Sequence, residues 1–148
     1  MKTINLSTEQ DTIDLANYLA PLLRAGDIIT LFGDLGSGKT FFVKQLGKAL
    51  GIEEEIDSPS FVLMKEYSGG HIPLYHLDLY RLKNREEVYE LGLFDILEKG
   101  ITVIEWPLLV NDILPYQTFK LEFHFDGKKR RVDILPDNEH SQYFCYKE

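Results

Sequence analysis

The chain has 148 residues, which fits one compact domain and argues against a two-domain enzyme, since domains usually hold about 100 to 200 residues. Hydrophobic residues make up 44% and charged residues 27% of the sequence, so the chain can bury a core and is not a disordered polymer. The formal net charge of −8 opposes contacts with phosphate backbones, and we expect no tight binding of RNA or DNA by this chain alone.

The first third of the chain predicts two helices with a buried strand between them. Ser7 and Gln10 have the spacing of a capping box, and apolar residues then recur at helical spacing. A short apolar run rich in β-branched residues and a second helical pattern follow, each ending at a glycine. The expected elements are a helix from the Ser7 cap through Leu23, a strand over residues 28–32 and a helix over residues 40–50.

The rest of the chain predicts two hairpins, two short helices and another buried strand. Turn signals separate the extended runs, and strict alternation of apolar and charged residues near the end indicates a hairpin with one solvated face. The expected elements are a hairpin of residues 61–67 and 72–79, a helix capped by Asn84 and Glu87 and ending at Leu91, a helix over 94–99, a strand over 101–105, and a hairpin of 119–125 and 131–135.

The clearest chemical signal is GDLGSGKT at residues 33–40, a complete G-x-x-x-x-G-K-[ST] phosphate loop between a predicted strand and a predicted helix. Its glycines let backbone N–H groups point into one anion-sized hollow at the positive end of the helix dipole. Lys39 can reach the β and γ phosphates, and the Thr40 hydroxyl can take one position on Mg²⁺. The nucleotide-binding candidates are Gly33, Gly36, Ser37, Gly38, Lys39, Thr40 and Phe41, the last through its backbone N–H.

The fold expected from these elements is α/β. We expect a single P-loop NTPase-like domain over residues 1–148, with a central, mostly parallel sheet flanked by helices and a C-terminal antiparallel hairpin.

Such a loop needs an acidic partner at the end of a neighbouring buried strand, because Mg²⁺ prefers oxygen ligands. Glu105 ends the apolar run Ile101 to Ile104 and is the candidate for Mg²⁺ and for catalysis. The alternative is that Glu105 is only the first solvated residue after a strand. Asp78 is a second catalytic candidate, because strand alternation would place it on one face with His76 and Tyr80.

Two further features have open interpretations. Trp106 follows Glu105 directly and could pack over the nucleotide or close a loop over the core. Residues 128–131 form a short basic run that could be a solvated hairpin or could contact phosphate or RNA. The pair of His76 and Asp78 offers too few ligands for a closed zinc site.

The chemistry allows several classes of nucleotide protein. No N-K-x-D motif for guanine occurs, so ATP is favoured over GTP. A small-molecule kinase is the main enzymatic alternative, although no cluster of arginines suggests the lid that neutralises a transferring phosphoryl group. A binding module switched by nucleotide, without required hydrolysis, is the alternative outside enzymes.

Five segments together resemble the bacterial TsaE (YjeE) family: GDLGSGKT, SPSF at 58–61, HLDLYRL at 76–82, LGL at 91–93 and IEWP at 104–107. The resemblance implies an ATPase that works with TsaB and TsaD to make threonylcarbamoyladenosine beside the anticodon of tRNA. On this pattern Lys39 and Thr40 match nucleotide and Mg²⁺ residues, Glu105 matches the second Mg²⁺ residue, and Asp78, Trp106 and Arg131 match further motif positions.

Other features of the sequence bear on mechanism and location. A chain with no obvious arginine finger or water-orienting glutamine should hydrolyse ATP slowly by itself, and its contact with tRNA would be indirect, through its partners. The single cysteine, Cys145, cannot form an intrachain disulfide, and no apolar stretch approaches the roughly 18 residues needed to span a bilayer. We therefore expect a cytoplasmic protein with no membrane contact.

Overall fold

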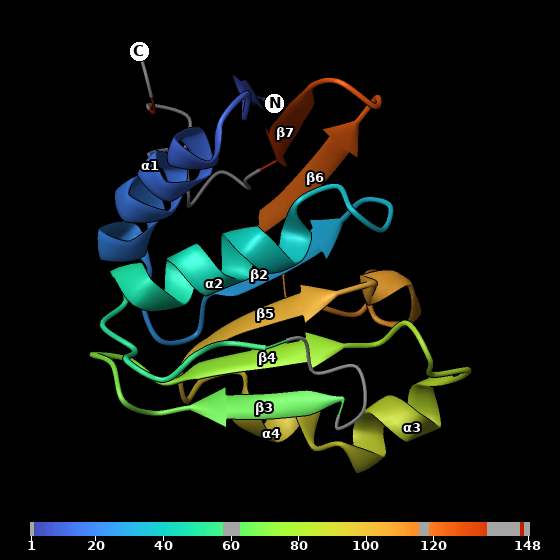
Figure 1. Ribbon diagram of the computed structural model, residues 1–148. Coiled ribbons are helices and arrows are strands. Elements are labelled where there is room, and N and C mark those ends of the chain that lie inside the picture. The colour runs from blue at the N-terminus through green and yellow to red at the C-terminus, as the bar shows by residue number, and fades with distance from the viewer. Residues whose placement is uncertain (1, 58–62, 116–118, 136–145, 147–148) are drawn as a thin grey trace.

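The computed structural model describes residues 2–57, 63–115, 119–135 and 146. The strands of these ranges form one sheet in the order β1-β7-β6-β2-β5-β4-β3 (Figure 1). They are β1 (Lys2–Asn5), β2 (Ile28–Phe32), β3 (Met64–Tyr67), β4 (Leu74–Asp78), β5 (Ile101–Glu105), β6 (Phe119–Phe125) and β7 (Arg130–Leu135). The helices are α1 (Glu9–Leu19), α2 (Lys39–Ala49), α3 (Arg85–Glu90) and α4 (Leu93–Ile96), with short 3₁₀ helices at Ala20–Leu22 and Pro107–Leu109.

Parallel pairing is confined to the centre of the sheet. The pairs β6 with β2, β2 with β5 and β5 with β4 are parallel, whereas β1 with β7, β7 with β6 and β4 with β3 are antiparallel. The expectation of a mostly parallel sheet is therefore wrong. Hairpins join β3 to β4 and β6 to β7, and hairpin strands are antiparallel, while β1 was not predicted and adds a third antiparallel pair.

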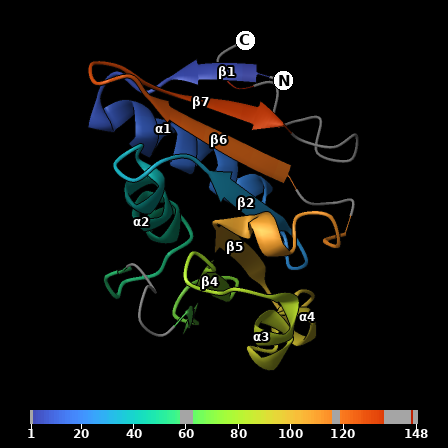
Figure 2. The same cartoon turned by 90° about the vertical axis from the view of Figure 1, so that its right-hand side faces the viewer.

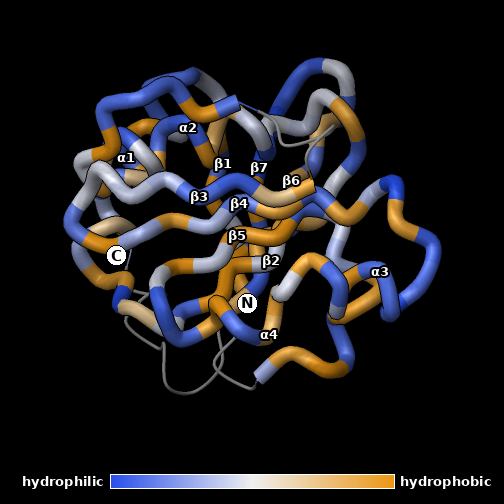
Figure 3. The backbone as a smooth tube through the Cα atoms, turned by 90° about the horizontal axis from the view of Figure 1, so that it is seen from below, coloured by the Kyte–Doolittle hydropathy of each residue, from blue (hydrophilic) through white to orange (hydrophobic). Residues whose placement is uncertain are grey.

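Two layers of helices cover the sheet. Figure 2 shows α1 and α2 on one face and α3 with α4 on the other. Alternate residues of β5 serve the two layers: Ile101 and Val103 belong to the larger core beneath α1 and α2, and Ile104 belongs to the smaller core beneath α3 and α4. Figure 3 shows apolar segments along the central strands and polar segments in the outer loops.

The first helix begins one residue later than expected. Thr8 and Asp11 form the capping box: the Thr8 N–H donates to the Asp11 carboxylate at 2.9 Å, and the Asp11 N–H donates to the Thr8 hydroxyl at 3.2 Å. Gln10 instead donates to Asp14 along the helix surface at 2.8 Å. The Ser7 and Gln10 cap is therefore wrong, because the overlapping pair one residue on supplies a carboxylate acceptor.

The other predicted elements are largely confirmed, with shifted ends. Asn84 caps α3 by accepting the Glu87 N–H at 3.1 Å. The first strand of the 61–79 hairpin starts at Met64, and residues 58–62, which include the whole SPSF segment, lie outside the described ranges, as does Cys145. Within the described ranges, no helix combines the length and the apolar character required to cross a membrane.

Candidate functional site

A cavity of about 530 Å³ lies where the strands β2, β4 and β5 end. These three strands are parallel, so their carboxyl ends meet at one edge of the sheet, from which the chain runs through the glycine-rich loop into α2 (Figure 1). The lining consists of loop and α2 residues 35–41, N-terminal residues 6–9, Thr12, Asp78, Glu105, Trp106 and Arg130. The structure thus brings most of the predicted site residues together.

The glycines of the loop are required by its shape. Gly33 has φ of +139°, and a Cβ there would lie 2.6 Å from the Phe123 carbonyl oxygen and 2.8 Å from the Ser37 hydroxyl. Gly38 has φ of +112° and directly precedes α2. Residues with a Cβ rarely adopt such positive φ angles. Glycine therefore allows the sharp turn that directs the start of α2 toward the cavity.

Lys39 is buried in the fold although it carries an ammonium group. Its side chain donates from Nζ to the Gly33 carbonyl oxygen at 2.6 Å, and Nζ lies 3.9 Å from the centre of the Trp106 ring. Desolvation by burial lowers the pKa of Lys39 below its usual value, while the nearby carboxylates of Glu105, Asp78 and Asp34 act in the opposite direction. The ammonium is thus held beside the loop by one backbone carbonyl and one aromatic ring, and no carboxylate is hydrogen-bonded to it among the described residues.

Asp78 and Glu105 are register partners at the ends of β4 and β5. Glu105 is only 3% exposed, and its Oε2 lies 2.6 Å from Nε2 of the fully buried His76. The alternative that Glu105 is merely a solvated residue after a strand is therefore wrong. Asp78 accepts the Tyr80 N–H at 3.0 Å, and both carboxylates line the cavity.

Trp106 lines the cavity and is only partly buried, outside both hydrophobic cores. Its backbone is left-handed, with φ of 54° and ψ of 61°, a conformation that non-glycine residues adopt mostly in turns and at functional sites. The Tyr80 ring lies 4.8 Å from the Trp106 ring. Tyr80 is beyond the end of β4 and is 60% exposed, so the expectation that strand alternation groups it with His76 and Asp78 is wrong.

Arg130, and not Arg131, is the arginine of the basic run that lines the cavity. Its guanidinium donates to the Gly36 carbonyl oxygen at 3.3 Å and stacks 4.1 Å from the Phe125 ring centre. Successive strand residues alternate between faces, so Arg130 shares the face of the buried Val132 and Arg131 takes the opposite face. The nucleotide role of Arg131 stays a prediction that rests on the resemblance.

Residues 6–9 and Thr12 form a wall of the cavity that sequence reasoning assigned only to a helix cap. Leu6 is anchored to the sheet because its N–H donates to the Arg130 carbonyl oxygen at 2.8 Å. No motif marks these residues. The only local signal is the cap itself, which fixes the direction in which the chain enters α1.

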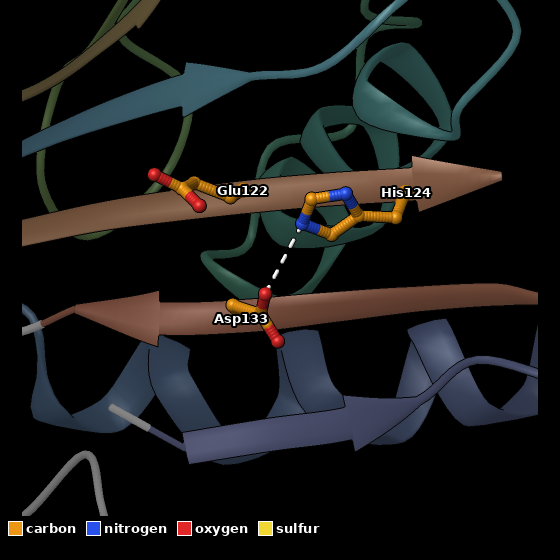
Figure 4. A group of neighbouring side chains, drawn as sticks. All are labelled: Glu122, His124 and Asp133. Atoms are coloured by element: carbon orange, nitrogen blue, oxygen red, sulfur yellow. Dashed lines mark hydrogen bonds and ion pairs between the residues drawn. The ribbon is translucent and has the colours of Figure 1, made fainter.

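A separate group of three possible metal ligands lies on β6 and β7, away from the cavity (Figure 4). His124 Nε2 lies 3.1 Å from Asp133 Oδ2, while the Thr3 hydroxyl donates to Asp133 Oδ1 at 2.6 Å. Glu122 is directly opposite Asp133 in the register of the two strands. Both Asp133 oxygens therefore already have partners, and this network explains the placement of the group without an ion.

The cavity has the chemistry to hold a phosphate chain next to a divalent cation. The first-turn N–H groups of α2 and the Lys39 ammonium can meet anionic oxygens, because a helix N-terminus has N–H groups without intrahelical partners. Ser37 is buried, and within the part of the chain that the structure describes its hydroxyl has no hydrogen-bond partner. Thr40, Asp78 and Glu105 supply the oxygen atoms that Mg²⁺ prefers.

Fold and site together define a mixed α/β protein whose glycine-rich loop and acidic strand ends share one cavity. The family model described as "Threonylcarbamoyl adenosine biosynthesis protein TsaE" matches residues 6–132. The chain belongs to the TsaE family, and the resemblance seen in its motifs is confirmed.

Named relatives and a solved structure agree with this assignment. The chain is 40% identical to the tRNA threonylcarbamoyladenosine biosynthesis protein TsaE of Rickettsia bellii, over 87% of this chain and 91% of that protein. It is 36% identical to the Bacillus subtilis protein of the same name, over 88% of this chain and 80% of that protein. The crystal structure of Bacillus subtilis YdiB superposes with a TM-score of 0.77 at 28% identity, covering 97% of this chain and 90% of that one.

Proposed function

We propose that this chain is a P-loop ATPase that binds ATP with Mg²⁺, hydrolyses it slowly, and acts with TsaB and TsaD in making threonylcarbamoyladenosine in tRNA. The observation that carries the ATPase proposal is the convergence of Lys39, Thr40 and Glu105 on one cavity beneath the glycine-rich loop. Membership of a family named for threonylcarbamoyladenosine biosynthesis supports the pathway. A cytoplasmic location follows from that pathway.

Each residue has a distinct task in this proposal. Backbone N–H groups of residues 36–41 bind the phosphate oxygens, and Lys39 leaves the Gly33 carbonyl and the Trp106 ring to reach the β and γ phosphates. Thr40 and Glu105 would hold Mg²⁺ directly or through its water, and Asp78 would orient the attacking water. Bound Mg²⁺ supplies charge neutralisation at the phosphates.

Slow turnover is consistent with the surroundings of the loop. Among the residues that the structure describes, Arg130 is the arginine lining the cavity, and its guanidinium is engaged by the Gly36 carbonyl. An arginine that neutralises the γ phosphate in the transition state typically raises turnover by about 10³-fold or more. No further arginine of the described ranges lines the cavity to serve this step, and docking on TsaB and TsaD could complete the site.

One experiment separates the ATPase from the alternatives. Purified chain, TsaB, TsaD and tRNA are supplied with Mg-ATP or with a nonhydrolysable ATP analogue, in the presence of separately prepared threonylcarbamoyl-adenylate. We expect ATP to sustain many rounds of tRNA modification and the analogue to sustain at most one round per complex. Equal yields with the analogue would support a nucleotide-switched binding module, and phosphate transfer to a small acceptor would support a kinase.

Thr40→Ala is expected to weaken Mg-ATP binding by at least about tenfold, because a lost contact to a charged group costs about 1.5 to 3 kcal/mol. Binding of Mg²⁺-free ATP should change by less than about twofold, since the hydroxyl acts through the metal. Calorimetry with and without Mg²⁺ measures both affinities. Thr40→Ser keeps the hydroxyl and should bind as the wild type does, whereas equal losses in both titrations would contradict the metal role.

Trp106 is the only tryptophan and reports on its own surroundings. Mg-ATP should shift its fluorescence saturably, because nucleotide draws the Lys39 ammonium away from its position 3.9 Å from the ring centre. Adenosine, which lacks phosphates, should leave the emission unchanged. A flat Mg-ATP titration, under conditions where calorimetry shows nucleotide bound, would contradict this movement.

A further inference from the structure

We infer that His76 is a positioning residue for hydrolysis: its ring holds one oxygen of the Glu105 carboxylate so that the other faces the nucleotide cavity. The inference rests on the proposed ATPase function. His76 itself does not line the cavity. The sequence predicted only that it shares a strand face with Asp78.

The geometry of the pair is defined by the sheet. His76 lies on β4 opposite Val103, and Glu105 is two residues further along β5 on the same face. The His76 side chain is 0% exposed and that of Glu105 is 4% exposed, with 2.6 Å between Nε2 and Oε2. A hydrogen bond so short and so shielded from water is stronger than one at the surface.

The surroundings of the ring decide which nitrogen donates. His76 Nδ1 is buried and has no hydrogen-bond partner among the described residues. A neutral ring with its proton on Nδ1 would bury an unpaired N–H and turn the Nε2 lone pair toward the carboxylate oxygen. A neutral ring with its proton on Nε2 donates to Glu105 and leaves only a lone pair unmatched, so His76 is the donor in the pair.

This donor restricts the orientation of the acid at the cavity. The final torsion of a glutamate side chain is broad and roughly two-fold, so a carboxylate without a fixed partner samples several orientations. The bond from His76 fixes Oε2, and Glu105 lines the cavity, so Oε1 is the oxygen available to Mg²⁺ or its water. Groups behind a metal-site ligand commonly change metal affinity or activity by about 10 to 100-fold.

Two amide variants of His76 differ in whether their side chain can reach Glu105. The Nε2 amide of His76→Gln reaches about as far as the histidine Nε2, whereas the amide of His76→Asn ends near the position of Nδ1 and cannot reach Glu105. Both replacements are polar and neutral, so burial costs are similar. A purely structural role for the ring predicts similar behaviour of both variants, and a positioning role predicts different behaviour.

The test measures steady-state Mg-ATP hydrolysis, Mg-ADP affinity and Tm for the full chain and both variants. We expect His76→Asn to lower kcat by about 10 to 100-fold with KM and Mg-ADP affinity changed less than about threefold, and His76→Gln to recover most of kcat. In the Glu105→Gln background, His76→Asn should lower kcat no further, because the two residues act as one unit.

The remaining outcomes of this test decide between the positioning role, a purely structural role and failure of the proposed function. Equal loss of kcat in both variants, in proportion to a fall in Tm, would overturn the positioning role, and so would wild-type kcat in His76→Asn. These results leave the ATPase proposal intact, because the wild-type chain still hydrolyses ATP. A wild-type chain that neither binds nor hydrolyses Mg-ATP would overturn the proposed function, and the inference with it.

Discussion

Lys39→Met is expected to lower ATP hydrolysis by about 100-fold or more, the usual loss when one preorganised group facing developing charge is removed. Methionine keeps the length of the aliphatic stem and removes the ammonium that can reach the β and γ phosphates. Support of tRNA modification should be lost in parallel. Phosphate release under saturating Mg-ATP measures the first effect, and modified nucleoside formed with TsaB and TsaD measures the second.

Without nucleotide, the Lys39→Met variant should have a Tm equal to or higher than that of the wild type. Burial lowers the folded pKa of Lys39 below the 10.5 of the unfolded chain, so below the folded pKa the charged side chain opposes folding. That cost disappears as the pH rises through the folded pKa toward and beyond 10.5. The Tm advantage of Lys39→Met should therefore be largest in acidic buffer and shrink as the pH rises toward and beyond 10.5.

A lysine on the same helix provides the control. Lys48 lies in the last turn of α2 and is exposed, so Lys48→Met should leave both hydrolysis and the pH dependence of Tm unchanged. Wild-type turnover in Lys39→Met would contradict the proposed ATPase. A large fall in Tm would instead show that the contact of Nζ with the Gly33 carbonyl stabilises the loop.

The parts of the site that sequence predicts well depend on local pattern. The loop at residues 33–40 combines a motif with a preceding strand and a following helix, and its geometry follows from neighbours in the chain. Glu105 could be placed beside the loop because the carboxyl ends of parallel strands meet at one edge of the sheet. These inferences need only the direction of each strand.

The parts of the structure that the sequence did not predict depend on pairing between strands far apart in the chain. The strand β1 has only four residues, of which Ile4 is buried, and it is ordered by pairing with β7 at the other end of the chain. No alternation over four residues distinguishes it from a loop. The same pairing brings residues 6–9 to the wall of the cavity, so that wall could not be predicted either.

Strand register explains the difference between Arg130 and Arg131. Only the resemblance singled out Arg131. Neighbouring residues of a strand point to opposite faces, so which of the two arginines faces the cavity depends on how β7 pairs with β6 and β1. The contact of His76 with Glu105 likewise requires the register of β4 against β5, since the two residues are 29 positions apart. The periodicity of a sequence indicates on which face of the sheet a residue lies. Its contacts with other strands depend on how those strands pair.

Glu105→Gln should lower hydrolysis by about 100-fold or more while Mg²⁺-free ADP still binds, because a positioned acid or base commonly contributes about 10² to 10⁴-fold. Glutamine keeps the shape, and its side-chain oxygen can still accept from His76. The negative charge beside the phosphates is lost, so Mg²⁺ should enhance nucleotide affinity less than in the wild type. Phosphate release and calorimetry with and without Mg²⁺ measure these changes.

A strand carboxylate outside the cavity provides the matched control for this variant. Glu122 lies on β6 and is absent from the cavity lining, so Glu122→Gln should hydrolyse ATP at the wild-type rate. If Glu105 served only to hold β4 and β5 together, Glu105→Gln would lower Tm and affect nucleotide binding equally with and without Mg²⁺. A loss of hydrolysis at unchanged Tm, together with a weaker Mg²⁺ effect, places the carboxylate in the chemistry, because a structural contact does not discriminate between metal-bound and metal-free nucleotide.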